Sequence, residues 1–292
     1  MPCFNHARFV VDSANGILGQ TQADLELIIV DDCSSDNSWE VIQSLARKDS
    51  RVKAIRHAHN QGASKSRNDG LYAASGEFIG FCDADDIWEK DKLRLQMEIL
   101  QSNPTHDVTY CDSIIIDEPG LPTGKRFSQL FPPPKSASGS LFPELLKRNF
   151  VNMQSVLMRK ECVQRVGYFD ENIKWVEDWW YWVRISRHHR FLYCQDALAR
   201  YRVHAHSTNR VQKRGYCINR LKVFKKILRD YPELSSCSQT DIVFKMGVEL
   251  CELGKYSTGR SMLWRAFGTS IRDVRTLPIC CKALRRLMIY AG

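Results

Sequence analysis

Three carboxylates stand in four consecutive positions, at Asp83, Asp85 and Asp86, directly after a short apolar run. The run, residues 78–82, has the length and composition of a buried strand. Side chains alternate along an extended chain, so Asp83 and Asp85 can project to the same side. Carboxylate oxygens placed together suit a hard divalent cation, Mg²⁺ or Mn²⁺, that also carries substrate phosphates. The alternative is that these residues only cap the following helix, because aspartate is favoured at helix starts.

Two further acidic pairs lie at the ends of predicted elements. Asp31 and Asp32 follow another predicted buried strand, residues 25–30. Ligands of open α/β sheets bind beyond the carboxyl ends of strands, so we expect both acidic clusters on one edge of one sheet, lining a single cleft. Glu177 and Asp178 open a predicted helix, where they could act on a substrate or serve only as a cap.

The elements that position these residues alternate between strand and helix, which predicts an α/β fold with a mostly parallel sheet flanked by helices. The predicted strands are 25–30, 52–57, 78–82, 107–117, 151–159 and 190–202. The predicted helices include 6–20, 63–74, 89–102, 141–147, 160–166, one that opens at Glu177, and a C-terminal series at 212–230, 240–253, 256–267 and 277–289. Residues 118–140 hold five of the ten prolines, so we expect a functional loop or lid without regular structure there.

Charge is divided unevenly along the chain. Residues 1–204 hold 25 Lys and Arg against 27 Asp and Glu, whereas the remaining residues hold 17 against 6. The split predicts a catalytic domain at 1–205 and a basic helical extension at 206–292. With no recognisable nucleic-acid motif, the basic charge does not predict a nucleic-acid partner.

The last predicted helix, 277–289, is basic and amphipathic, with one apolar face formed by Leu277, Cys281, Leu284 and Met288. Such a helix can lie in an anionic membrane interface without spanning it, or it can pack its apolar face on neighbouring helices. The 11 cysteines contain no Cys-x-x-Cys, which indicates neither a disulfide framework nor a zinc site. No apolar run approaches the ~20 residues of a membrane span. We expect a cytoplasmic protein, with peripheral contact at most at the inner face of the cell membrane.

With these residues in view, the chain resembles the family 2 inverting glycosyltransferases of the GT-A fold over roughly residues 1–210. The resemblance rests on an ordered set of motifs: Pro2-x-Phe4-Asn5, Val30-Asp31-Asp32-x-Ser34-x-Asp36, Asn60-x-Gly62, Arg67-Asn68-x-Gly70, Asp83-Ala84-Asp85, Gly167-x-Phe169-Asp170, Glu177-Asp178-Trp179 and Tyr201-Arg202-x-His204. It implies an enzyme that moves a sugar from a nucleotide-diphosphate donor to a glycan or lipid-linked acceptor, with inversion, in the assembly of cell-surface polysaccharide.

The resemblance also implies roles for individual residues. Asp32, with Asp31, would hold the base or ribose of the donor. Asp83 would contact the ribose or a metal-bound water, and Asp85 would coordinate Mg²⁺ or Mn²⁺ on the diphosphate. Asp178 would be the general base. Metal ligands are implied at Asp83, Asp85 and His204, and further substrate contacts at Pro2, Asn5, Asn60, Gly62, Arg67, Glu177, Trp180 and Arg202.

Some of these residues could instead have a purely structural role. His204 could be a structural histidine, and Arg67 could simply pair with an acidic neighbour. Asp178 is expected to stay ionised at pH 7, because the dipole of its helix favours the anion.

The family pattern has an apolar strand just before Pro-x-Phe-Asn, and this sequence shows none. We expect a start upstream of Met1 rather than a loss of that strand, since losing it would strip hydrogen bonds from a neighbour and leave a large void. An alternative function is a catalytically inactive GT-A module that binds glycans or scaffolds an assembly. A sugar nucleotidyltransferase would need a Gly-rich phosphate loop with basic residues after the first strand, and none is visible.

Overall fold

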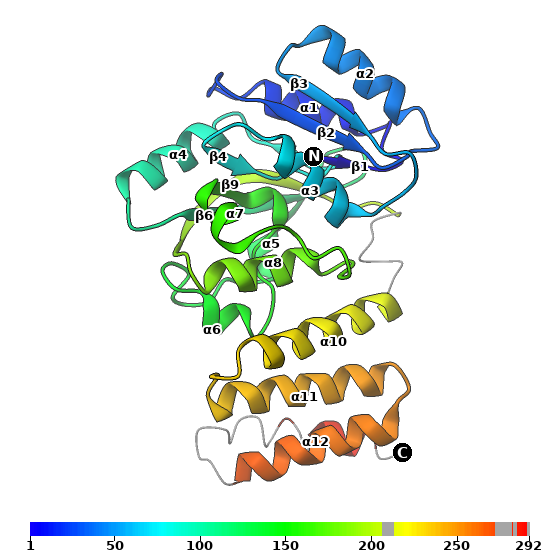
Figure 1. The fold of residues 1–292 in the computed structure, drawn as a ribbon, viewed down its shortest axis with the longest axis vertical. Helices are drawn as coiled ribbons and strands as arrows, with labels where there is room; N and C mark the ends of the chain where they lie inside the picture. The colour runs from blue at the N-terminus through cyan, green and yellow to red at the C-terminus, as the bar shows by residue number, and fades with distance from the viewer. Residues whose placement is uncertain (206–212, 272–281, 283–284, 291–292) are drawn as a thin grey trace. The chain divides into compact units, whose positions relative to one another are not determined.

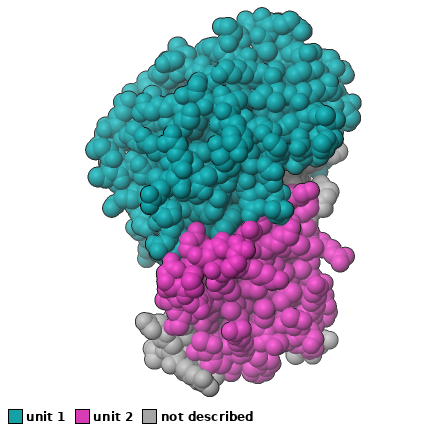
Figure 2. Space-filling view, in the orientation of Figure 1, with its two compact units in different colours: residues 1–145, 149–172, 177–207 teal, residues 146–148, 173–176, 208–292 magenta. Residues whose placement is uncertain are grey.

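The computed structural model describes residues 1–205, 213–271, 282 and 285–290. Its chain divides into two compact units (Figure 2). Unit 1 comprises residues 1–145, 149–172 and 177–207, and unit 2 comprises residues 146–148, 173–176 and 208–292. The predicted domain boundary between residues 205 and 206 stays a prediction. The two units divide the chain near this position, but residues 146–148 and 173–176 group with the C-terminal helices. All of the residues predicted to act in catalysis or metal binding belong to unit 1.

A three-stranded parallel sheet forms the first part of unit 1 (Figure 1), in the order β1 (Pro2–Cys3), β2 (Leu27–Asp31) and β3 (Val52–Arg56). Every residue of β2 is buried, as expected of an apolar parallel strand that is covered on both faces. The helices that belong to this part are α1 (Val10–Leu18), α2 (Ser38–Lys48) and α3 (Ala63–Ala73).

A six-stranded mixed sheet forms the rest of unit 1. Its strands are β4 (Phe78–Gly80), β8 (Val156–Arg159), β6 (Val108–Ile116), β9 (Phe191–Arg202) and β5 (Ile87–Trp88) in spatial order, with β7 (Pro122–Arg126) paired to β6. Only β6 and β9 pair in parallel; the other pairs are antiparallel. The predicted α/β class is confirmed, but the strands divide between two sheets. The alternation of strand and helix that produces parallel pairing holds only for the first part of the chain.

Two local predictions need correction. Ile87–Trp88 forms a strand with Arg200 and Ala199, so the helix predicted at 89–102 begins at Lys92 (α4, Lys92–Ser102). The segment 118–140 contains β7 and the short helix α5 (Phe127–Leu130). β7 pairs with the preceding strand β6, which orders part of this proline-rich segment. Proline is tolerated on an edge strand, so its presence does not exclude this pairing. The remaining short elements of unit 1 are α6 (Phe142–Leu145), the 3₁₀ helix η1 (Met153–Ser155), α7 (Glu161–Val166) and α8 (Glu177–Ser186).

Unit 2 contains the long helices α10 (Lys213–Asp230), α11 (Ser236–Glu252) and α12 (Tyr256–Ile271). The predicted helix 277–289 lies mostly outside the described residues. Within its described part, Leu287 packs into the core of unit 2, whereas Met288 is 70% exposed, so Met288 does not lie on the packed face. Among the described helices, none is both long enough and apolar enough to cross a membrane.

Candidate functional site

The buried guanidinium of Arg67, on α3, joins two of the predicted acidic clusters. Its Nη2 donates to Asp83 Oδ1 at 2.8 Å, and its Nη1 donates to Glu177 Oε1 at 2.7 Å. Burial alone lowers the pKa of Arg67, but the carboxylates of Asp83 and Glu177 outweigh it and raise that pKa above its usual value. One charged side chain therefore brings the end of β4 and the start of α8 into a single site.

Asp178 lies beside this bridge, at the second residue of α8. Its Oδ1 accepts a hydrogen bond from the Trp179 amide at 2.6 Å, and its Oδ2 accepts one from Asn149 Nδ2 at 2.8 Å. Burial and the neighbouring Glu177 raise the pKa of Asp178 to about 7. The expectation of a firmly ionised carboxylate at pH 7 was wrong, because burial outweighs the helix terminus. A carboxylate with this pKa is well suited to accept a proton near neutral pH.

A possible metal-binding cluster is formed by His6, Asp85 and His204, whose ligand atoms all lie within 4.8 Å of one another. His204 Nε2 lies 3.1 Å from Asp85 Oδ2, and His6 Nδ1 is buried without a hydrogen-bond partner. Burial raises the pKa of Asp85, but the bond to His204 and the nearby His6 lower it below its usual value overall. Two imidazoles and one carboxylate suit a divalent transition-metal ion such as Mn²⁺.

Two features of this cluster differ from the sequence prediction. Asp83 is not among the three residues, since its carboxylate pairs with Arg67. His6 is a candidate metal ligand that the sequence did not predict. It lies beside the Pro2–Asn5 motif, and only the fold brings it close to Asp85 and His204.

Arg202 contacts the protein's own backbone around the Asp85 loop. Its Nε donates to Asp85 O at 2.7 Å, and its Nη1 donates to Glu118 O at 2.8 Å. Its backbone amide donates to Asp86 Oδ1 at 2.8 Å. Burial and the neighbouring Asp85 and Asp83 raise the pKa of Asp86 well above its usual value. These contacts tie the side chain of Arg202 to the backbone of Asp85, and the predicted contact of Arg202 with the substrate stays a prediction.

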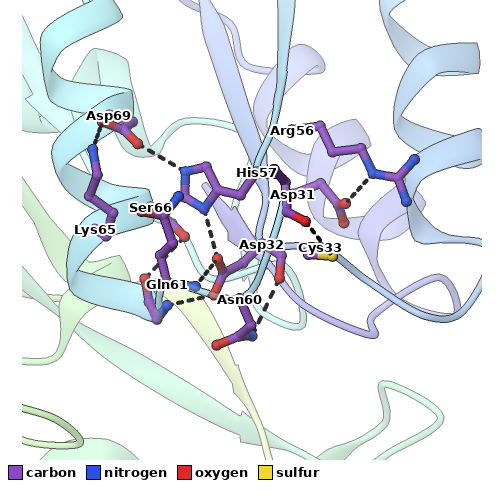
Figure 3. A network of polar contacts seen from close by, with 12 residues as sticks. Asp31, Asp32, Cys33, Arg56, His57, Asn60, Gln61, Lys65, Ser66 and Asp69 are labelled. Atoms are coloured by element: carbon purple, nitrogen blue, oxygen red, sulfur yellow. Dashed lines mark hydrogen bonds and ion pairs between the residues drawn. The ribbon is translucent and has the colours of Figure 1, made fainter.

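Asp32, directly after β2, holds the loop between β3 and α3 in place (Figure 3). Its Oδ1 accepts from the Gln61 amide and its Oδ2 from the Gly62 amide, both at 2.7 Å. His57 Nδ1 lies 2.7 Å from the same carboxylate, and His57 Nε2 lies 2.9 Å from Asp69 Oδ2. The imidazole of His57 thus lies between two carboxylates. Asp32 is therefore already occupied by contacts within the protein.

Asp31 has fewer hydrogen-bond partners than Asp32. Its side chain is fully buried, and its Oδ2 accepts from the Ser34 amide at 3.2 Å and lies 3.4 Å from Arg56 Nε. Its Oδ1 is buried without a hydrogen-bond partner. Buried acceptors are nearly always satisfied, so this atom is suited to an N–H group of a ligand. The sequence placed Asp32 ahead of Asp31 in donor binding, and that order stays a prediction.

The other predicted contact residues shape the same loops. Asn5, at φ 57°, accepts from the Ser35 amide at 2.8 Å, and Asn60 Nδ2 donates to Asp32 O at 3.3 Å. Pro2 belongs to β1, and Gly62, at φ 90°, precedes α3.

Trp180 is 2% exposed, so its predicted contact with a sugar ring is wrong for this structure. The guanidinium of Arg184 lies 5.9 Å from its ring. Packing of α8 against the core takes the indole away from the surface.

The profile named Glycosyl transferase family 2 matches residues 1–163, more than half of the chain. The chain belongs to glycosyltransferase family 2. Among curated relatives, an uncharacterised glycosyltransferase of Rickettsia felis is 26% identical over 238 residues, 82% of this chain. The chain spans only 38% of that relative's length.

Two other relatives have more specific names. The putative teichuronic acid biosynthesis glycosyltransferase TuaG of Bacillus subtilis is 27% identical over 203 residues, covering 69% of this chain and 77% of TuaG. The Escherichia coli protein WfgD, a UDP-Glc:alpha-D-GlcNAc-diphosphoundecaprenol beta-1,3-glucosyltransferase, is 40% identical over 103 residues, covering 35% of this chain and 40% of WfgD.

Solved structures confirm the GT-A fold of this family 2 chain. Residues 1–349 of S. aureus TarS, in complex with UDP-GlcNAc, superpose with a TM-score of 0.65 at 17% identity, covering 92% of this chain and 79% of that one. The mannosyltransferase PcManGT from Pyrobaculum calidifontis, in complex with GDP-Man and Mn²⁺, gives a TM-score of 0.63 at 16% identity, covering 99% of this chain and 80% of that one.

Because Arg67 joins Asp83 to Glu177, we expect that replacing its charged side chain strongly reduces the stability of the protein. Arg67→Met leaves two carboxylates without their shared partner, so the free energy of unfolding should fall by about 3–5 kcal/mol, measured by urea denaturation. The double variant Arg67→Met/Glu177→Leu should recover part of this loss, because it also removes the more buried carboxylate. A loss below about 1 kcal/mol for Arg67→Met would mean that the bridge behaves as an exposed ion pair.

Proposed function

We propose that this family 2 protein transfers a sugar from a nucleotide-diphosphate donor to a hydroxyl group of a glycan or lipid-linked acceptor, with inversion. The Arg67 bridge carries the proposal, because it ties Asp83 of the donor side to the residue next to Asp178. The names of TuaG and WfgD, and the nucleotide-sugar complexes of TarS and PcManGT, support this class of donor and acceptor.

The donor side is formed by the ends of β2 and β4. The unpartnered Oδ1 of Asp31 can accept an N–H of the nucleobase. Asp32 keeps the loop at residues 60–62 in place through two backbone amides. The partly exposed Asp83 can reach the ribose while Arg67 fixes its orientation.

A divalent ion, Mg²⁺ or Mn²⁺, would be held by His6, Asp85 and His204. When bound, such an ion neutralises charge on the diphosphate leaving group. Arg202 contributes by fixing the backbone of Asp85. His204 Nε2 and Asp85 Oδ2 already lie 3.1 Å apart, and ligand atoms that are placed together before binding lower its cost.

The acceptor side is formed by Asp178. Its carboxylate takes the proton of the acceptor hydroxyl as the oxygen attacks the anomeric carbon, on the face opposite the departing nucleotide diphosphate. The new C–O bond forms as the bond to the diphosphate oxygen breaks, which inverts the configuration. Burial of Asp178 matches its pKa to this task. Asn149 and the Trp179 amide fix the direction of its two oxygens.

Asp178→Asn should reduce sugar transfer by ~10²–10⁴-fold, because the amide cannot accept the proton. The wild-type rate should rise with pH through about 7, since the base acts only when ionised, and the variant should lose this dependence. The measurement is release of nucleotide diphosphate in the presence of acceptor, across a panel of sugar donors.

Asn149→Ala is the matched control for this experiment. It removes a hydrogen bond that lowers the pKa of Asp178, so the rise in rate should move to higher pH with activity retained. Near-normal turnover of Asp178→Asn would place the base elsewhere, with Glu177 the first candidate. Donor binding without transfer by the wild type would favour the inactive, glycan-binding alternative.

The metal cluster is tested by Mn²⁺ titration with calorimetry, in the presence of UDP or GDP. Asp85→Asn and His204→Ala should each weaken Mn²⁺ binding by more than about tenfold. Asp83→Asn should weaken it less, since Asp83 pairs with Arg67. If instead Asp83→Asn abolishes binding and His6→Ala has no effect, the ion sits on the Asp83–Asp85 pair, as the sequence predicted.

We also propose that the basic end of unit 2 contacts anionic membrane. Met288 and Ile289 are 70% and 63% exposed. A depression of about 360 Å³ beside them is lined by five cations, a single carboxylate and apolar side chains. Its lining residues are Arg220, Phe244, Lys245, Val248, Glu249, Lys282, Arg285, Arg286 and Ile289. Basic residues near an anionic surface contribute on the order of 1 kcal/mol each.

Flotation with phosphatidylserine-containing liposomes at low salt tests this contact. Met288→Asp/Ile289→Asp should reduce the bound fraction several-fold, because the change adds like charge and removes the apolar contacts. Leu130→Asp, at a position 56% exposed in unit 1, should leave binding unchanged. The membrane contact is excluded if the intact protein stays with the unbound fraction, or if the double variant floats as well as the wild type.

A further inference from the structure

Two short segments of the chain lead directly to the two groups that form the acceptor side, and both segments belong to unit 2. Residues 146–148 precede Asn149, and residues 173–176 precede the first turn of α8, where Asp178 lies. Asn149 Nδ2 donates to Asp178 Oδ2 at 2.8 Å within unit 1. The carboxylate and its amide partner are therefore each joined through the chain to a segment that groups with the C-terminal helices.

Asn219, in α10, holds the second of these segments. Its Oδ1 accepts a hydrogen bond from the Lys174 amide at 3.2 Å, and its Nδ2 donates to Gly215 O at 3.0 Å. Asn219 is buried, and a buried amide side chain takes its partners from within the protein. Because both ends of this amide are engaged, it fixes the backbone at Lys174.

The next residue, Trp175, is held by the close fit of its ring against α10. Its backbone is left-handed, at φ 64°, a conformation that is unfavourable for a residue with a bulky side chain. A Cβ at Gly215 would lie only 2.7 Å from Trp175 Cη2, so this glycine allows the ring to approach the helix backbone. Ile173 and Val176, on either side, are buried. A strained turn persists only where its surroundings determine it, so the course of the chain into α8 depends on this fit.

Lys245, in α11, holds the first segment. Its Nζ donates to Lys147 O at 2.7 Å and also pairs with Asp241, one turn earlier on the same helix. The preceding residue of the segment, Leu146, is buried. The backbone is thus anchored two residues before Asn149.

We propose that these three contacts position the general base. The Asn149–Asp178 hydrogen bond stays formed because the segment before each residue is held by α10 or α11. The inference rests on the proposed role of Asp178, and it makes Asn219, Gly215 and Lys245 positioning residues for that base. All of the holding contacts lie within unit 2, the bond lies within unit 1, and the chain joins the two.

Loss of this positioning should change the proton affinity of Asp178. The charged groups near its carboxylate are Glu177 on α8 and Arg67 on α3. Burial and Glu177 raise the pKa of Asp178. Arg67 and the hydrogen bonds from Trp179 and Asn149 lower it. When Asn149 is less well placed, one lowering contribution is lost, so the pKa rises and less of the base is ionised at pH 7.

The test measures the pKa of Asp178 by NMR of carboxyl carbons in isotope-labelled protein, with the signal assigned from Asp178→Asn. Asn219→Leu is the main variant, because it changes no charge and little volume. We expect its Asp178 pKa to rise by roughly 0.5 unit or more, and the rate of transfer to shift to higher pH with it. Affinity for UDP or GDP, measured by calorimetry, should change by less than about twofold. Ile218→Ala, at the neighbouring position, which is 42% exposed, should leave the pKa and the rate profile unchanged.

Lys245 provides an independent arm of the test. Lys245→Met should raise the pKa of Asp178, whereas Lys245→Arg keeps both a donor and the charge and should retain the wild-type value. Lys225→Met removes the same charge from an exposed position of α10 and should have no effect. In an Asn149→Ala background, where the hydrogen bond is already absent, Asn219→Leu should add less than about 0.2 unit.

An unchanged Asp178 pKa in both Asn219→Leu and Lys245→Met, in proteins shown by thermal melting to be folded, would overturn the positioning. So would a full further shift in the Asn149→Ala background. Should Asn219→Leu fail to fold, the two Lys245 variants decide the question. Failure of the proposed function is seen separately: near-normal transfer by Asp178→Asn would remove the base, and with it this inference, whatever the NMR titration shows.

Discussion

A buried positive charge must be matched by nearby negative charge, and the guanidinium of Arg67 imposes this constraint on unit 1. Its partners Asp83 and Glu177 come from elements far apart in sequence. The helix that carries it is anchored on both sides. Asn68 exchanges two hydrogen bonds with the backbone of Phe169, at 3.0 and 2.8 Å, and Asp69 reaches Asp32 through His57. α3 thus fixes the loop after β2, the loop after β4 and the start of α8 together.

The two ends of the site use their carboxylates differently. Asp32 accepts hydrogen bonds from two backbone amides, whereas Oδ1 of its neighbour Asp31 has no hydrogen-bond partner. Glu177 pairs with Arg67 through Oε1, and burial together with Glu177 raises the pKa of the neighbouring Asp178 to about 7. Within each pair, the two carboxylates therefore have different surroundings. Adjacent carboxylates can therefore differ in their properties although their side chains are alike. Burial and the available backbone hydrogen-bond donors make the difference.

Sequence patterns predicted the acidic clusters and most of the elements that carry them, since buried strands followed by aspartates leave a local signal. They did not predict which member of a pair is free, because that depends on amides such as those of Gln61 and Gly62, donated from another loop. His6 joined Asp85 and His204 only through the fold. The pKa of Asp178 was misjudged because the helix terminus is visible in sequence and burial is not. The proline-rich segment 118–140 was expected to be irregular, yet pairing with β6 orders part of it.

Cysteine placement has a practical consequence for following the donor site. Of the nine free cysteines in the described residues, seven are buried and only Cys33 and Cys237 are partly exposed. Burial raises the pKa of Cys3 and of Cys111 to about 12, which suppresses the thiolate that alkylating reagents attack. Cys33 directly follows Asp32, in a left-handed turn at φ 62°, and Cys237 lies on α11 of the other unit. Iodoacetamide labelling read by mass spectrometry thus contains its own reference: a nucleotide bound at Asp31, as proposed above, would shield Cys33, while Cys237 would record the reagent dose.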